Sequence, residues 1–93
     1  MDTPRFVTKS LDLIPQDEQK SVVRSLDLLE QFEREPGRVR LEAARAIRPK
    51  TFILKASKSY RIVYELHEGK VRIIDLVHRD RIGLAIRKHG KPR

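Results

Sequence analysis

Hydrophobic residues recur at two different spacings along the chain, and the spacing changes near Thr51. Before that point, apolar side chains return every three or four residues, which is the period of an amphipathic helix. The clearest such series is Val22, Val23, Leu26, Leu29 and Phe32. After that point, β-branched and aromatic residues stand together in short runs, which is typical of strands. The pattern therefore predicts an α+β fold with an N-terminal helical hairpin, a small antiparallel sheet and a short C-terminal helix.

A short first helix is predicted over residues 4–13. Thr3 can accept a hydrogen bond from an unpaired amide, and Pro4 suits a first helical position. The side expected to face the core holds Phe6, Ser10, Leu13 and Ile14. Val7 and Leu11 leave a strand as the alternative for this segment.

A longer second helix should follow Pro15 and end at Pro36-Gly37. Asp17 and Glu18 place negative charge in its first turn, where the helix dipole favours it. The two helices would then form an antiparallel hairpin with a shared apolar stripe.

Residues 38–48 alternate arginines with apolar residues. This composition predicts one or two further helical turns, which Pro49 would stop.

Strands are predicted over 51–56, 60–67 and 71–78, as an antiparallel meander of three strands with room for a fourth. Glu68-Gly69 would form a two-residue hairpin loop that sets the register of the last two strands. The expected opposite pairs are His67 with Lys70, Glu65 with Arg72, Val63 with Ile74, Arg61 with Leu76, and Ser59 with His78.

One face of this hairpin is expected to be open and the other to pack on the helices. The packed face would hold Tyr60, Ile62, Tyr64, Leu66, Val71, Ile73 and Val77, together with Asp75. The charge of Asp75 is then unfavourable unless it has a partner. After the last strand, Asp80 can cap a short helix that contains Ile82 and Ala85, and residues 90–93 form a basic end.

The 93 residues suffice for one small core, so a single domain over residues 1–93 is expected. No apolar run approaches the ~20 residues of a membrane span, and the first residues have neither a basic nor an apolar export region. We therefore expect a cytoplasmic protein without membrane contact. With no cysteine and three dispersed histidines, no metal or other cofactor is expected.

Positive charge is concentrated in the second half of the chain. Residues 1–47 contain 8 basic and 9 acidic side chains, whereas residues 48–93 contain 13 basic and 4 acidic ones. Such an asymmetric surface is typical of proteins that contact nucleic-acid phosphates, although a solvated face or an acidic protein partner would also suit it.

In the expected register, Arg61 and His78 are diagonal neighbours on the open face, so one phosphate could bridge them. Arginine can bind phosphate oxygens, and histidine can transfer a proton near neutral pH. Glu65 could act as a base, but an ion pair with Arg72 is the favoured interpretation. The alternative for His78 is a strand-end side chain that binds the backbone.

The segments Leu-Lys-Ala-Ser-Lys-Ser-Tyr-Arg-Ile-Val-Tyr (54–64) and Val-Arg-Ile-Ile-Asp-Leu-Val-His-Arg (71–79), placed after a helical hairpin, resemble the RelE/ParE superfamily of bacterial type II toxin–antitoxin toxins. The resemblance implies a RelE-like fold and a ribosome-dependent, metal-independent mRNA endoribonuclease that inhibits translation. It also implies that Arg61 contacts the scissile phosphate and that His78 and Arg79 complete the catalytic set. The expected partners are the ribosome, mRNA and a cognate antitoxin protein.

Further basic residues are expected to contact RNA: Lys50, Lys55, Lys58, Arg72, Arg81, Arg87 and Lys88. The chain departs from the RelE pattern at three positions. It has no tyrosine near Gly83, and Phe52 and Leu54 stand where RelE has lysines, with Lys55 expected on the other side of the strand. These departures favour the alternative of a non-catalytic inhibitor, ParE-like and directed at gyrase, or a binding module such as those fused to helicases. A basic α+β subunit of a larger assembly is the third interpretation.

Overall fold

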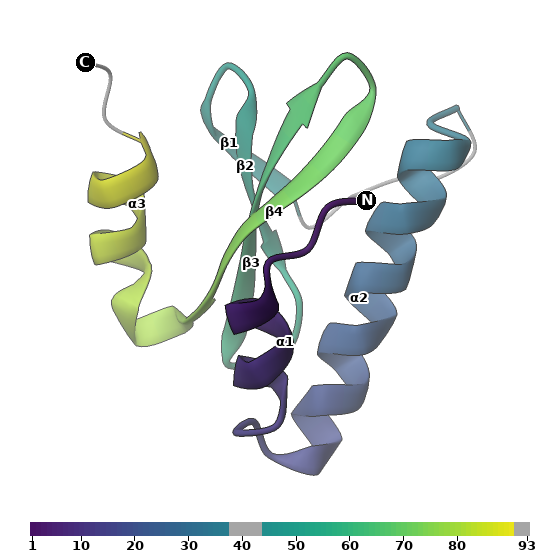
Figure 1. Cartoon of the computed structure of the whole chain (residues 1–93). Coiled ribbons are helices and arrows are strands. Elements are labelled where there is room, and N and C mark those ends of the chain that lie inside the picture. Colours follow the sequence, from purple (N-terminus) through teal and green to yellow (C-terminus); the bar gives the residue numbers. More distant parts are fainter. Residues whose placement is uncertain (38–43, 91–93) are drawn as a thin grey trace.

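The computed structural model of the protein describes residues 1–37 and 44–90 (Figure 1). In chain order, the elements are α1 (Arg5–Leu11), α2 (Gln16–Arg34), β1 (Ala44–Arg48), β2 (Thr51–Lys55), β3 (Tyr60–His67), β4 (Lys70–His78), the 3₁₀ turn η1 (Arg79–Arg81) and α3 (Ile82–Gly90).

The strands form one antiparallel sheet in the order β1-β2-β3-β4, and helices cover both of its faces. Figure 1 shows α1 and α2 side by side on one face and α3 on the other. The predicted α+β class, the helical hairpin and the antiparallel meander are therefore confirmed, and the sheet has a fourth strand, β1, in a segment that was predicted to be helical. Within the described residues, no helix is long and apolar enough to cross a membrane.

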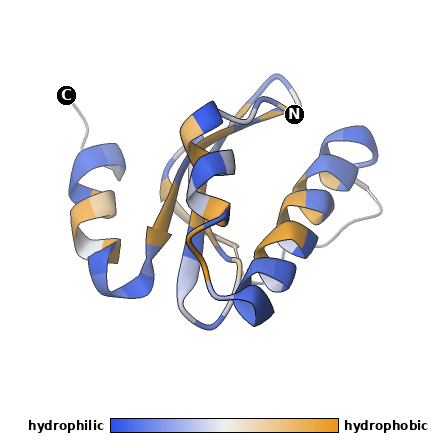
Figure 2. Cartoon of the chain, turned by 60° about the horizontal axis from the view of Figure 1, so that its bottom comes forward, coloured by the Kyte–Doolittle hydropathy of each residue, from blue (hydrophilic) through white to orange (hydrophobic). Residues whose placement is uncertain are grey.

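The second helix has the predicted position and most of the predicted inner stripe. It begins after Pro15, has both predicted acids in its first turn, and ends two residues before Pro36. Val22 and Leu29 are completely buried, whereas Val23, which was predicted to belong to the stripe, is exposed. Figure 2 shows the hydrophobic residues of α2 on the side that faces α1 and the sheet.

The first helix presents a different face from the one predicted. Val7 is completely buried, whereas Phe6 and Leu13 are exposed; of the residues predicted to face the core, Ile14, which follows the helix, is buried. Pro4 rather than Thr3 occupies the capping position, without a side-chain hydrogen bond. Before the helix, the Asp2 amide donates to Val71 O (3.1 Å), and the Ile73 amide donates to Asp2 O (2.8 Å). This short bridge to β4 sets the direction in which the chain enters the helix.

The helical turns predicted between residues 38 and 48 are wrong where the structure describes that segment. Residues 38–43 lie outside the described residues, and Ala44–Arg48 is strand β1. Ala44 pairs with Leu54 and Ala46 with Phe52. Pairing with the exposed edge of β2 satisfies the backbone groups of both strands, which outweighs the modest helix preference of the alanines.

The predicted hairpin loop is confirmed, but the register beyond it changes. Glu68 and Gly69 have φ values of 51° and 79°, as a two-residue hairpin loop requires, and His67 faces Lys70. A bulge between Val63 and Tyr64 then places Val63 opposite Asp75. The predicted pairs Val63–Ile74, Arg61–Leu76 and Ser59–His78 are therefore wrong.

The bulge exchanges the faces of the last residues of β4, because one extra residue in a strand turns every later side chain over. Leu76 packs in the core beneath α1 and α2, and Val77 packs beneath α3. Asp75 also leaves the predicted face: its Oδ2 lies 3.2 Å from Nε2 of His89 on α3. This pair satisfies the charge and ties the last helix to the sheet.

Two hydrophobic clusters stabilise the sheet from its two sides. The larger lies beneath α1 and α2 and is built around Ile62, Tyr64, Val71 and Ile73. The smaller lies beneath α3 and consists of Ile53, Val63 and Ala85 with partly buried isoleucines and Val77 around them. The face that was predicted to be open is thus covered by α3 over part of its area.

Candidate nucleic-acid interface

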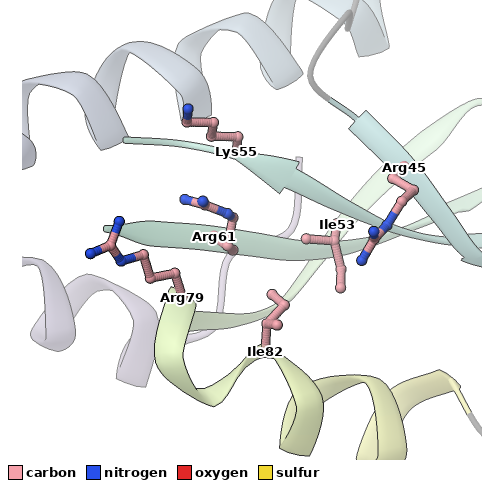
Figure 3. Close-up of a pocket in the computed structure, with 6 residues that line it drawn as sticks. All are labelled: Arg45, Ile53, Lys55, Arg61, Arg79 and Ile82. Atoms are coloured by element: carbon pink, nitrogen blue, oxygen red, sulfur yellow. The ribbon is translucent and has the colours of Figure 1, made fainter. Parts of the chain in front are cut away.

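A hollow with strongly basic walls lies on the α3 side of the sheet. It has a volume of about 290 Å³ and is lined by Arg45, Ile53, Lys55, Arg61, Arg79 and Ile82, which together we call the basic pocket (Figure 3). Among the described residues that line it, none is acidic. Four cations around one hollow, with no carboxylate in its described lining, favour a bound anion.

Three of these cations share a face because of the strand register. Lys55 pairs with Arg61 across β2 and β3, and Arg45 pairs with Ile53 across β1 and β2. Directly opposed side chains point to the same face, and so do residues two apart in one strand. Lys55 therefore lies on the opposite side of β2 from Phe52 and Leu54, as expected, and this is the side that carries Arg61.

Arg61 is held by the loop between β2 and β3. Its Nη1 donates to Ser57 O (2.8 Å), to Tyr60 O (3.0 Å) and, at 3.4 Å, to Lys58 O. Within the described part of the chain, its Nε and Nη2 donate to no protein acceptor. The guanidinium is therefore fixed on one side while its other donors remain available to a ligand.

Arg79 enters the pocket from the turn that follows β4. Its amide donates to Ser59 O (2.7 Å), which fixes η1 against the start of β3. Its side chain is about half exposed, and Nε lies 3.9 Å from Oδ1 of the neighbouring Asp80. Figure 3 shows the side chains of Arg61 and Arg79 extending toward the same end of the pocket, with Arg45 at the opposite end and Ile53 and Ile82 between.

His78 does not lie with Arg61, contrary to the sequence prediction. It faces Tyr60, with the two ring centroids 5.3 Å apart and the planes at 87°, while Arg61 faces Val77 on the other side of the sheet. Its Nδ1 accepts a hydrogen bond from the Asp80 amide (3.1 Å). His78 is therefore a strand-end histidine bonded to the backbone, which was the alternative interpretation. It caps η1, whereas Asp80 had been predicted to cap the helix that follows the last strand.

Glu65 also lies away from the basic pocket. It stands opposite Arg72 as predicted, but its Oε1 lies 3.4 Å from Nε2 of His67. Arg72 has Asp2 as its nearest charged partner instead, at 3.9 Å. The favoured Glu65–Arg72 ion pair is thus wrong: Glu65 contacts His67, and Arg72 contacts Asp2.

The other basic residues predicted to contact RNA are exposed but dispersed. Lys58 lies in the loop whose carbonyl groups hold Arg61, and Arg81 lies in η1. Lys50 follows β1, Arg72 is on β4, and Arg87 and Lys88 are in the last turn of α3. Of the seven basic residues that were predicted to contact RNA in addition to the catalytic set, only Lys55 belongs to the lining described for the basic pocket.

Arg45 is the basic lining residue that the sequence did not predict, because its segment was assigned to a helix. The alternation of small or apolar residues with arginine in Ala44–Arg48 was compatible with a strand and would have placed Arg45 on a sheet.

Within the described residues, no group of three or more histidine, aspartate or glutamate side chains is arranged to hold a metal ion. No protein-family model matches the chain, and no curated protein or solved structure matches it either.

Proposed function

We propose that this protein is a RelE-like toxin of a type II toxin–antitoxin system that binds RNA through the basic pocket. The observation that supports this most directly is the convergence of Arg45, Lys55, Arg61 and Arg79 on one hollow whose described lining has no acid. The resemblance of residues 54–64 and 71–79 to RelE supplies the biological setting: the ribosome and mRNA as targets, and a cognate antitoxin as inhibitor.

The chemistry of the pocket suits a phosphodiester better than a simple anion. Arg61 and Arg79 offer planar forks that match phosphate oxygens, and Lys55 adds a mobile point charge. Ile53 and Ile82 form an apolar wall between the two ends of the pocket, where a ribose or base could rest. A nucleotide unit presents this combination of charged and less polar surface.

The binding test uses a fluorescent single-stranded RNA and measures anisotropy with wild type, Arg61→Ala and Arg79→Ala. A lost charge-assisted hydrogen bond is worth about 1.5–3 kcal/mol, so each variant should bind about tenfold more weakly or worse. Arg24→Ala is the matched control: it removes the same charge from an exposed position on α2, across the sheet from the pocket. Equal losses in all three variants would refute the pocket as the binding site.

The position of His78 favours a second candidate, the non-catalytic inhibitor or binding module. A proton donor must reach the leaving oxygen, and His78 lies on the opposite face from Arg61 and Arg79. If mRNA is cleaved, Arg61 and Arg79 would stabilise the charge on phosphorus, and the proton would have to come from a group other than His78.

Induced expression in a bacterial host separates these candidates. Translation arrest with new mRNA ends, mapped by primer extension, supports a ribosome-dependent endoribonuclease. Arrest without new ends supports a non-catalytic inhibitor of translation, and a DNA-damage response with ongoing translation supports the gyrase-directed alternative. A neighbouring reading frame whose product neither binds the chain nor relieves toxicity would contradict the toxin–antitoxin assignment.

A further inference from the structure

A network of hydrogen bonds joins the start of α2 to the loop between β2 and β3. Oε1 of Glu18 accepts from the Ser59 amide (2.7 Å) and from Ser57 Oγ (3.0 Å). One and two turns further along α2, Ser21 and Ser25 donate from Oγ to Ala56 O, at 2.8 and 3.2 Å. The helix is therefore hydrogen-bonded to this loop at three successive positions, Glu18, Ser21 and Ser25.

The same loop holds the guanidinium of Arg61. Ser57 Oγ, which donates to Glu18, also accepts from the Tyr60 amide (3.1 Å) and so closes the loop on itself. Its carbonyl groups then face Arg61, whose Nη1 donates to Ser57 O and Tyr60 O. A continuous set of bonds thus runs from a carboxylate on the α2 side of the sheet to a cation on the α3 side.

We propose that Glu18 is a positioning residue for Arg61: by fixing the conformation of the β2–β3 loop, it holds the guanidinium in the basic pocket. The consequence for ligand binding rests on the proposed function, whereas the positioning itself does not. Glu18 does not line the basic pocket, so its effect on a ligand would pass through Arg61.

The electrostatics of Glu18 agree with this role. Burial by itself raises the pKa of the carboxyl group, but hydrogen bonds from the Ser59 amide and Ser57, with a smaller contribution from the charge of His78, bring the pKa below its ordinary value of 4.5. Glu18 is therefore ionised at neutral pH, and its bonds to the loop are of the stronger, charge-assisted kind.

Side-chain NMR of ¹⁵N-labelled protein tests the positioning directly, with the Arg61 guanidinium signals assigned by their loss in Arg61→Lys. In Glu18→Ala, those signals should show faster guanidinium rotation and faster hydrogen exchange. Glu18→Gln retains Oε1, which accepts both bonds in the structure, so it should keep them slow. Asp17→Ala removes an exposed carboxylate from the same helical turn and should also leave them slow. An unchanged Arg61 in Glu18→Ala would overturn the proposal.

RNA affinity tests the consequence. Glu18→Ala should weaken binding about three- to tenfold, and this effect should disappear when Arg61 is already alanine, since residues that act through one another are not additive. An equal loss in the Arg61→Ala background would show that Glu18 acts in another way and would contradict the proposal. If the wild type does not bind RNA, the proposed function fails, and the NMR result alone decides whether Glu18 positions Arg61.

Discussion

Tyr60 and His78 face each other across β3 and β4 in an edge-to-face contact, with ring centroids 5.3 Å apart. This contact places His78 on the sheet face that packs against α1 and α2, and it places Arg61, the neighbour of Tyr60, on the face beneath α3. The sheet therefore separates His78 from the basic pocket.

Substitution of His78 by alanine should affect stability and leave RNA binding nearly unchanged. The variant loses the hydrogen bond from the Asp80 amide and the contact with Tyr60, which together are worth about 1–2 kcal/mol of unfolding free energy. Urea unfolding and RNA anisotropy measure the two effects. A tenfold loss of RNA affinity with unchanged stability would show that His78 contacts the RNA and would contradict the prediction.

Arg61→Lys should bind RNA almost as weakly as Arg61→Ala. The loop carbonyl groups already occupy Nη1, and the remaining donors of the planar fork are those that a lysine ammonium cannot replace. Affinities of the three proteins for the same RNA provide the measurement. Recovery of wild-type affinity in Arg61→Lys would show that charge alone is required.

RNA affinity should fall steeply with salt, and the slope should report the basic pocket. For single-stranded nucleic acid, log K changes with log salt by about −0.7 for each neutralised phosphate. Lys55→Ala and Arg79→Ala should each make the slope shallower by about that amount, whereas Arg24→Ala should not. The measurement is a titration series between roughly 50 and 200 mM salt, and identical slopes in all variants would count against contacts from the pocket.

Stability should decrease in acid through Glu18. Its folded pKa is lowered, so ionised Glu18 stabilises the native state above its unfolded pKa of 4.5, and this contribution is lost as the pH falls through the folded pKa. The difference in urea midpoint between wild type and Glu18→Gln should be largest near pH 6 and smallest near roughly pH 3. A difference independent of pH would contradict an ionised Glu18 in the native state.

The phenol of Tyr64 should ionise at a higher pH in the folded protein than in the unfolded chain. Burial raises the pKa of its phenol from 10.0 to about 12, because the anion would lose its hydration. Tyr60→Phe leaves Tyr64 as the single tyrosine of the chain. In this variant, the midpoint of the ultraviolet absorbance change on tyrosine ionisation should lie above pH 10.0 in the folded protein and return to pH 10.0 in urea. Stability should fall as the pH rises from the unfolded toward the folded pKa, since only the unfolded chain ionises readily.

Local sequence patterns determined the elements whose cause is local. The helical period and the flanking prolines placed α2, and the β-branched and aromatic runs placed β2, β3 and β4 to within a residue or two. Glu68 and Gly69 predicted their own loop, because a two-residue hairpin needs positive φ values that few residue pairs accept. Up to Glu65 and Arg72, the register follows from that loop.

Only the tertiary structure decided which side chains meet in the basic pocket. Ile62, Val63 and Tyr64 are all buried, so β3 is packed on both faces and its pattern of apolar residues gives no signal for the bulge beside it. That bulge separates His78 from Arg61. Strand β1 likewise exists because the edge of β2 offers it backbone partners, and it adds Arg45 to the lining of the basic pocket. Both features arise from contacts between segments distant in sequence, which no local pattern encodes.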